Sequence, residues 1–153
     1  MIDQEIASII KFVLGAAPQG VAPYYYRMRE DFAVPGIFFP PPEFEAQGDT
    51  LASYKFDFAW YIPIFAKDDA GAYAIAHAVA NTLMARRRLV PIIDEAGEAT
   101  GKGLRLDDPE VKVLDRSGVA STAELTLRWS SRRPYDAVEA QKMMEFTLNF
   151  IDK

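Results

Sequence analysis

The stretch from Tyr54 to Leu83, YKFDFAWYIPIFAKDDAGAYAIAHAVANTL, sets the architecture of this chain. In its first part every second residue is aromatic or aliphatic: Tyr54, Phe56, Phe58, Trp60, Ile62 and Ile64. Successive residues of a strand point to opposite faces of a sheet, so this period of two predicts a long strand with one heavily buried face.

A helix is predicted directly after this strand. Asp68 and Asp69 can cap its first turn, because carboxylates accept hydrogen bonds from free backbone N–H groups and suit the positive end of the helix dipole. The run Arg86 to Arg88 suits the opposite, negative end. An apolar stripe at helical spacing predicts the buried face: Ala72, Ile75, Ala76, Val79 and Leu83.

Upstream of this stretch, an amphipathic helix is predicted from Ile2 to Leu14 and is expected to end at Gly15. Two short aromatic segments, 23–28 and 37–39, are typical of strands. Pro40, Pro41 and Pro42 cannot donate to a strand ladder, so we expect the chain to leave the sheet there and to form a loop over 43–49.

Downstream, the sequence predicts a strand at 89–93 and a polar loop around Gly97, Gly101 and Gly103. Two further strands, 104–114 and 122–130, should pair as an antiparallel hairpin. In the second strand two faces are expected: Ala123, Leu125, Leu127 and Trp129 inward, and Thr122, Glu124, Thr126 and Arg128 outward.

The segment after Tyr135 fits a helix or, from Met144, an alternating strand; its helix-prone start favours the helix. We therefore predict one domain over residues 1–153, of the α+β class, with helices packed on a mostly antiparallel sheet.

Composition excludes several classes of function. The chain has no cysteine, so it can hold neither a disulfide nor a thiolate zinc site. Its net charge of −5 argues against nucleic-acid binding as the main role, since that needs a basic stripe. No apolar run approaches the ~18 residues of a membrane-spanning helix, and the start lacks the basic region of a secretory signal. We expect a soluble protein without a cofactor.

Candidate sites for chemistry have plainer structural explanations. His77 is the only histidine, and without a second histidine or a cysteine it is a poor metal ligand. The acids at 94–98 and at 107–115 do not match the spacing of a calcium loop. The glycine-rich segment DEAGEATGKG (94–103) lacks the phosphate-loop pattern and is acidic. We predict no catalytic, cofactor or metal residue.

Two segments are candidates for a protein interface. The proline-rich stretch from Phe32 to Phe44 contains Phe38, Phe39 and Phe44, and part of its apolar surface is expected to be exposed for a partner or to cover the core. The arginines Arg86, Arg87 and Arg88 could bind an acidic partner or form a solvated helix end.

Taken together, the elements resemble the tail terminators and related minor tail or neck proteins of tailed bacteriophages. The resemblance spans about residues 2–133. Besides the first helix and the stretch from Tyr54, it is carried by PYYYRM (23–28), VPGIFFPPP (34–42), LVPII (89–93), GLRLDDPEVKVLD (103–115) and ASTAELTLRWSSRRP (120–134). The chain departs from the family pattern in its acidic glycine loop and its long C-terminal segment, which leaves a neighbouring neck or tail-completion role open.

The resemblance implies a structural, non-enzymatic protein of the virion tail or neck, assembled in the host cytoplasm. It implies a homo-oligomeric ring, commonly a hexamer, that caps the tail tube protein and meets the head–tail connector protein. DNA would pass through the ring without specific binding. Two alternatives stay open: a small α+β enzyme or ligand-binding domain with a pocket beside the aromatic sheet, and a protein-binding module unrelated to phage.

Overall fold

The computed structural model describes residues 2–27, 30–114 and 121–136. The residues group into two compact units, which we call unit 1 (1–43 and 59–129) and unit 2 (44–58 and 130–153). The segment from 137 onward, for which the sequence favours a helix, lies outside the described residues.

Two helices of unit 1 follow the predicted pattern. Helix α1 spans Ile2–Ala16 and buries Ile9 and Val13 completely; it continues through Gly15 for one further residue. Helix α2 spans Asp69–Ala85, and the Asp68 carboxylate caps it by accepting a hydrogen bond from the Gly71 N–H at 2.7 Å. The predicted stripe from Ala72 to Leu83 is buried at all five positions.

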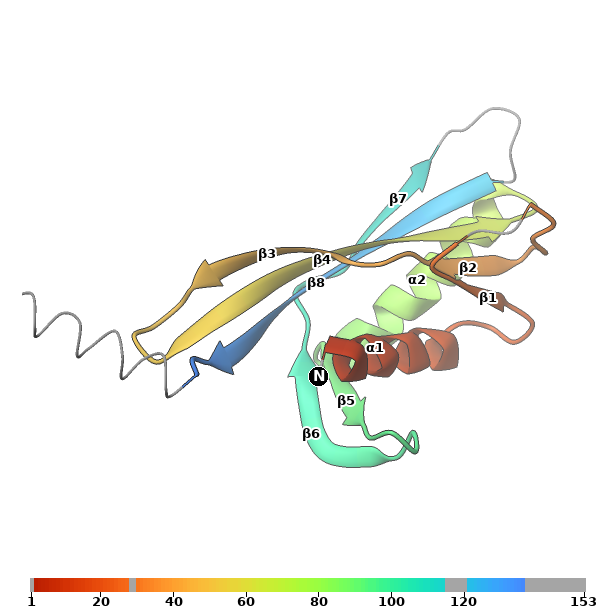
Figure 1. Cartoon of the computed structure of the whole chain (residues 1–153). Coiled ribbons are helices and arrows are strands. Elements are labelled where there is room, and N and C mark those ends of the chain that lie inside the picture. The colour runs from red at the N-terminus through yellow and green to blue at the C-terminus, as the bar shows by residue number, and fades with distance from the viewer. Residues whose placement is uncertain (1, 28–29, 115–120, 137–153) are drawn as a thin grey trace, which may run out of the picture. The chain divides into compact units, whose positions relative to one another are not determined.

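The strands of unit 1 lie side by side in the order β1 (Ala22–Tyr25), β2 (Gly36–Phe39), β4 (Ser53–Ala66), β8 (Ser121–Pro134) and β7 (Glu110–Leu114). Strand β1 runs parallel to β2, and β2 runs antiparallel to β4. The predicted antiparallel hairpin is confirmed for β7 and β8, but the strand predicted over 104–114 is divided, because 104–105 belong to another strand and 106–109 are irregular. Helices α1 and α2 lie on the same side of these strands (Figure 1). The α+β prediction is therefore confirmed.

A tryptophan pair forms the centre of this core. Trp60 of β4 and Trp129 of β8 are each 1% exposed, and their ring centroids lie 6.0 Å apart. The Trp60 indole N–H donates to the Pro40 carbonyl at 2.5 Å, and the Trp129 indole N–H donates to the Glu5 carboxylate at 3.3 Å. Both polar edges are thus satisfied where the rings are buried.

Part of the predicted glycine loop is a strand instead. Strand β6 (Ala99–Arg105) includes Gly101 and Gly103 and pairs antiparallel with β5 (Leu89–Ile93) in a separate ladder. The prediction failed because the glycine and polar residues of β6 give no alternating apolar pattern. The strand is held at its end by Leu104, which lies opposite the fully buried Val90 in the ladder.

The outward prediction for Thr122 and Thr126 is also wrong, since they are 2% and 4% exposed. Strand β8 lies between β4 and β7, so neighbouring strands flank its short side chains on both sides. On the β7 side their partners are Leu114 and Glu110.

Strand β3 (Glu43–Gly48), whose residues 44–48 belong to unit 2, pairs with β4, so the loop predicted over 43–49 is wrong. All six residues of β3 are exposed, which explains why they carry no apolar pattern. Residues 53–58 of β4 and 130–134 of β8 complete the described strands of this unit. The Tyr135 N–H donates to the Ala52 carbonyl at 3.0 Å.

Candidate interaction surface

Aromatic side chains cover one face of unit 2, which we call the aromatic face: Phe44, Tyr54, Phe56, Phe58 and Tyr135. Phe44 meets Phe56 edge to face at 5.2 Å, and Tyr54 meets Tyr135 at 5.5 Å. The Arg133 guanidinium lies 5.0 Å from the centroid of Phe56. These ring distances fall in the range of favourable aromatic and cation–π contacts.

The aromatic face is incompletely buried. Phe44 is 56% exposed and Tyr135 is 40% exposed, whereas Tyr54 and Phe56 are half-buried. Among the described residues of unit 2 there are strands but no helix. Clustered aromatic side chains that stay exposed are typical of surfaces that bind another protein.

The opposite face of unit 2 is polar, and its side chains form hydrogen bonds and an ion pair with one another. The Ser130 hydroxyl donates to Asp57 at 2.6 Å, the Gln47 amide also donates to it, and Lys55 lies 3.9 Å away. The Ser130 hydrogen bond is the main cause that lowers the pKa of Asp57; desolvation, the next largest influence, raises it, and Gln47 and Lys55 lower it further.

The three candidate phenylalanines of the proline-rich stretch lie in different environments. Phe39 is 2% exposed, stacks on Tyr25 at 5.9 Å and packs against Trp60, so it is part of the core. Phe38 is half-buried on β2. Phe44 alone of the three is exposed and belongs to the aromatic face. Within this stretch, Phe39 therefore covers the core, and Phe44 forms exposed apolar surface.

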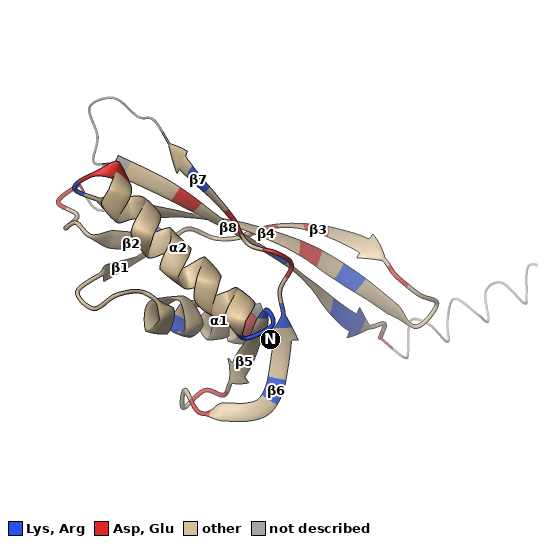
Figure 2. Ribbon diagram, turned by 180° about the vertical axis from the view of Figure 1, so that it is seen from behind, with Lys and Arg blue, Asp and Glu red and all other residues tan. Residues whose placement is uncertain are grey.

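The candidate arginines form a tight turn after α2, which we call the arginine turn (Arg86–Arg88). The N–H of Arg87 bonds to the Met84 carbonyl and the N–H of Arg88 to the Leu83 carbonyl, the pattern of a Schellman helix end. Arg87 and Arg88 have φ values of 57° and 62°, in the left-handed region. Figure 2 shows the acidic start and the basic end of α2.

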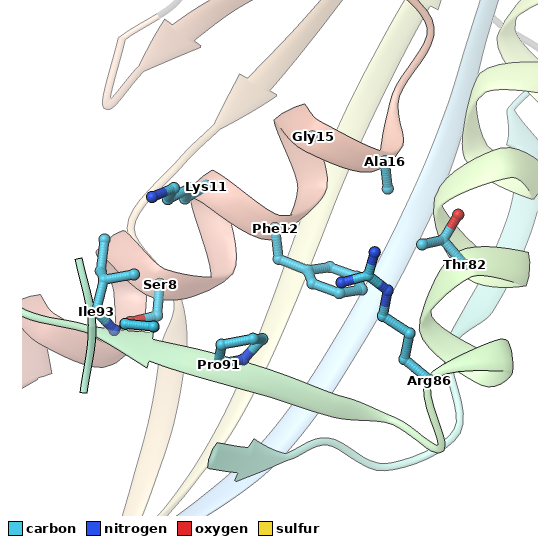
Figure 3. Close-up of a pocket in the computed structure, with 10 residues that line it drawn as sticks. Ser8, Lys11, Phe12, Gly15, Ala16, Thr82, Arg86, Pro91 and Ile93 are labelled. Atoms are coloured by element: carbon cyan, nitrogen blue, oxygen red, sulfur yellow. The ribbon is translucent and has the colours of Figure 1, made fainter. Parts of the chain in front are cut away.

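A pocket of about 320 Å³ lies beside the arginine turn, among α1, β5, the end of α2 and the edge of β6. Figure 3 shows the Arg86 guanidinium beside the Phe12 ring, at 5.8 Å from its centroid. Pro91 and Ile93 of β5 add apolar wall, and Lys11 donates to the Gly97 carbonyl at 2.5 Å. The pocket suggested by the sequence, between the aromatic sheet and a loop, is a different place.

The residues considered for chemistry are solvent-facing or have structural partners. His77 is exposed and stacks on Tyr73 at 6.0 Å. Asp94 accepts hydrogen bonds from the N–H groups of Ala96 and Glu98 and so fixes the turn before β6. Within residues 2–27, 30–114 and 121–136, no acid–histidine cluster could hold a metal ion. Neither described helix is long and apolar enough to cross a membrane.

Sequence reasoning missed Arg133 and Tyr135 of the aromatic face. A signal was present, because both continue the alternation of β8 past the inward-facing Trp129. It also missed Lys11 and Phe12 in the pocket, which only the packing of α1 against β5 brings near the arginine turn.

Comparison with known proteins relates this chain to two proteins of Bacillus subtilis (strain 168). It is 29% identical over 149 residues to the phage-like element PBSX protein XkdJ, covering 97% of both chains. It is 30% identical over 145 residues to the uncharacterized protein YqbJ, covering 95% of both chains. No protein-family model matches it. The chain belongs to the family of YqbJ, of which XkdJ, a protein of a phage-like element, is a homologue.

Proposed function

We propose that this protein is a structural component of a phage-type particle, and specifically a tail terminator whose subunits form a ring. The observation that carries the proposal is the similarity to XkdJ, which extends over 97% of both chains. The α+β fold agrees with the resemblance to tail terminators. The proposed role is to cap the tail tube and to join it to the head–tail connector.

The exposed surfaces support an assembly role. A closed ring needs two different surfaces on each subunit, because each copy contacts one neighbour with one surface and the other neighbour with another. Unit 2 offers an incompletely buried aromatic face, strand β3 offers six exposed residues, and unit 1 offers the pocket lined by Lys11 and Arg86. Protein surfaces of these kinds gain free energy by binding other proteins.

The proposed partners are other copies of the chain, the tail tube protein and the connector, with assembly in the host cytoplasm. DNA would pass through the ring, and the net charge of −5 favours passage without binding, since phosphates and carboxylates repel each other. In this proposed role the protein acts on no substrate.

Two measurements test the proposal. Deleting the gene from the phage or prophage that carries it should leave heads and tail tubes intact but unjoined in electron micrographs. A tagged copy that restores the particles should be detected by immunogold at the joint between head and tail. Normal particles from the deletion strain, or label on heads alone, would overturn the proposal.

A further inference from the structure

We propose that the arginine turn and the pocket beside it bind strand β3 of a second copy of this chain. The inference rests on the proposed ring and names the two surfaces that meet in it. The pocket and β3 are different surfaces of the chain, as the head-to-tail contacts of the proposed ring require. Such a contact repeats from copy to copy and closes when the rotation fits.

The pocket is suited to an acidic segment. Its ten lining residues include two cations, Lys11 and Arg86, and no acid. Among the described residues, the hydrogen-bond partner of Lys11 is the neutral Gly97 carbonyl, and Arg86 lies over the Phe12 ring. In the described part of the chain, neither cation has a carboxylate at ion-pair distance. The walls are otherwise largely apolar, so a bound carboxylate would be partly shielded from water.

The backbone of the arginine turn gives a second, independent argument. A residue with a side chain costs roughly 1–2 kcal/mol in the left-handed region, which glycine occupies freely. Arg87 nevertheless holds the position at which a helix end usually has glycine, and Arg88 adopts a second left-handed conformation directly after it. Arg88 forms an ion pair with Asp108 at 3.6 Å, whereas Arg87 has no such partner among the described residues. Strain kept at an exposed cation points to a use for its side chain.

Strand β3 carries a pair of acids that can complement the pocket. Glu43 and Glu45 lie two residues apart, so both carboxylates project from one face, about 7 Å apart. Both are exposed, and within residues 2–27, 30–114 and 121–136 neither forms an ion pair. Four other carboxylates already have cationic partners: Asp49, Asp57, Asp108 and Glu110.

The number and the sign of the charges are complementary. Arg86 and Arg87 are successive residues of the arginine turn, so two guanidinium groups are available to two carboxylates that project from one face of a strand. Guanidinium–carboxylate pairs can form two parallel hydrogen bonds, which fixes orientation as well as affinity.

Charge reversal in both surfaces tests the contact. We compare the wild-type chain with Arg86→Glu/Arg87→Glu, with Glu43→Lys/Glu45→Lys, and with the variant carrying all four changes. Mass is measured by light scattering across protein and salt concentrations, and particles are counted in a strain that depends on each variant. Each double variant should raise the dissociation constant of the oligomer at least about tenfold, since like charges would face each other. The fourfold variant should recover assembly, because every pair has opposite signs again.

Controls separate folding from binding. Lys67→Glu/Lys102→Glu changes the net charge as much as the arginine variant does, at exposed positions outside the pocket lining, and should assemble like the wild type. All variants should keep the wild-type circular dichroism, since exposed substitutions change stability little.

Three outcomes would overturn the contact. If either double variant assembles normally, or if the fourfold variant does not recover, the contact is wrong while a wild-type ring still supports the proposed function. If the wild-type protein forms no oligomer, either alone or at the joint of the particle, both the contact and the proposed ring fail.

Discussion

Strand β4 contributes residues to both units, and its alternating apolar residues are buried to different extents in each. In unit 1 the side chains of Trp60, Ile62 and Ile64 are at most 1% exposed, because α1 and α2 lie over that side of the strands. In unit 2 the alternation continues at Tyr54 and Phe56, which are only half-buried beside the exposed Phe44. The difference indicates that periodicity determines which side chains share a face, and that only a covering element turns the face into a core. We therefore expect unit 1 to carry most of the folding stability, and the aromatic face of unit 2 to contribute to binding rather than to stability.

The largest expected effect is on the core of unit 1. Trp60→Ala should lower the free energy of unfolding by about 3–5 kcal/mol, because it removes a buried aromatic side chain and leaves a cavity. Urea unfolding monitored by far-ultraviolet circular dichroism measures this loss. A decrease below about 1 kcal/mol would contradict the assignment of stability to unit 1.

Strain at the surface of unit 1 gives a smaller effect of opposite sign. Arg87→Gly should raise the free energy of unfolding by about 1 kcal/mol, since glycine adopts a φ of 57° without steric cost. The same variant should weaken assembly, because it removes a cation of the proposed contact. Arg88→Gly is a less clean comparison, since it also removes the ion pair with Asp108. A thermal melt with no gain for Arg87→Gly would argue that the turn is unstrained.

Phe44→Ala should change the free energy of unfolding by less than about 1 kcal/mol, since more than half of the side chain is already exposed. It should nevertheless reduce assembly if the aromatic face binds a neighbour. Tyr73→Ala is the matched control, because Tyr73 is 49% exposed on α2 of unit 1 and belongs to neither proposed surface. Equal assembly of the two variants, measured by light scattering, would contradict a binding role for the aromatic face.

The limits of sequence reasoning follow the same division. Strand β4, the stripe of α2 and the inward residues of β8 were predictable, because each buries one face and so has an apolar period. Strand β3 was not, since its six exposed residues have no such period and follow three prolines. Phe39 and Phe44 could not be told apart, because their difference lies in the strands beside them. The left-handed turn at Arg87 could not be predicted, because its usual sequence signal is a glycine and this position holds an arginine.

The smallest expected effect lies on the polar face of unit 2. The pKa of Asp57 is lowered mainly by the Ser130 hydroxyl, so this carboxylate stabilises the fold above its ordinary pKa of about 3.9. That contribution is lost as the pH falls through the lowered pKa of the folded state. It is small, since the Asp57 side chain is 37% exposed to water.

Ser130→Ala should therefore move the Asp57 titration upward, towards its ordinary range, because it removes the principal donor to the ionised carboxylate. The carboxyl carbon chemical shift of Asp57, followed by NMR from neutral to acidic pH, measures this change directly. Ser131→Ala alters the neighbouring serine of β8 without removing that donor, and should leave the titration where it is. An unchanged Asp57 pKa in Ser130→Ala would mean that Lys55 and Gln47 hold the carboxylate ionised, and that the polar face does not depend on β8 in the way its hydrogen bonds indicate.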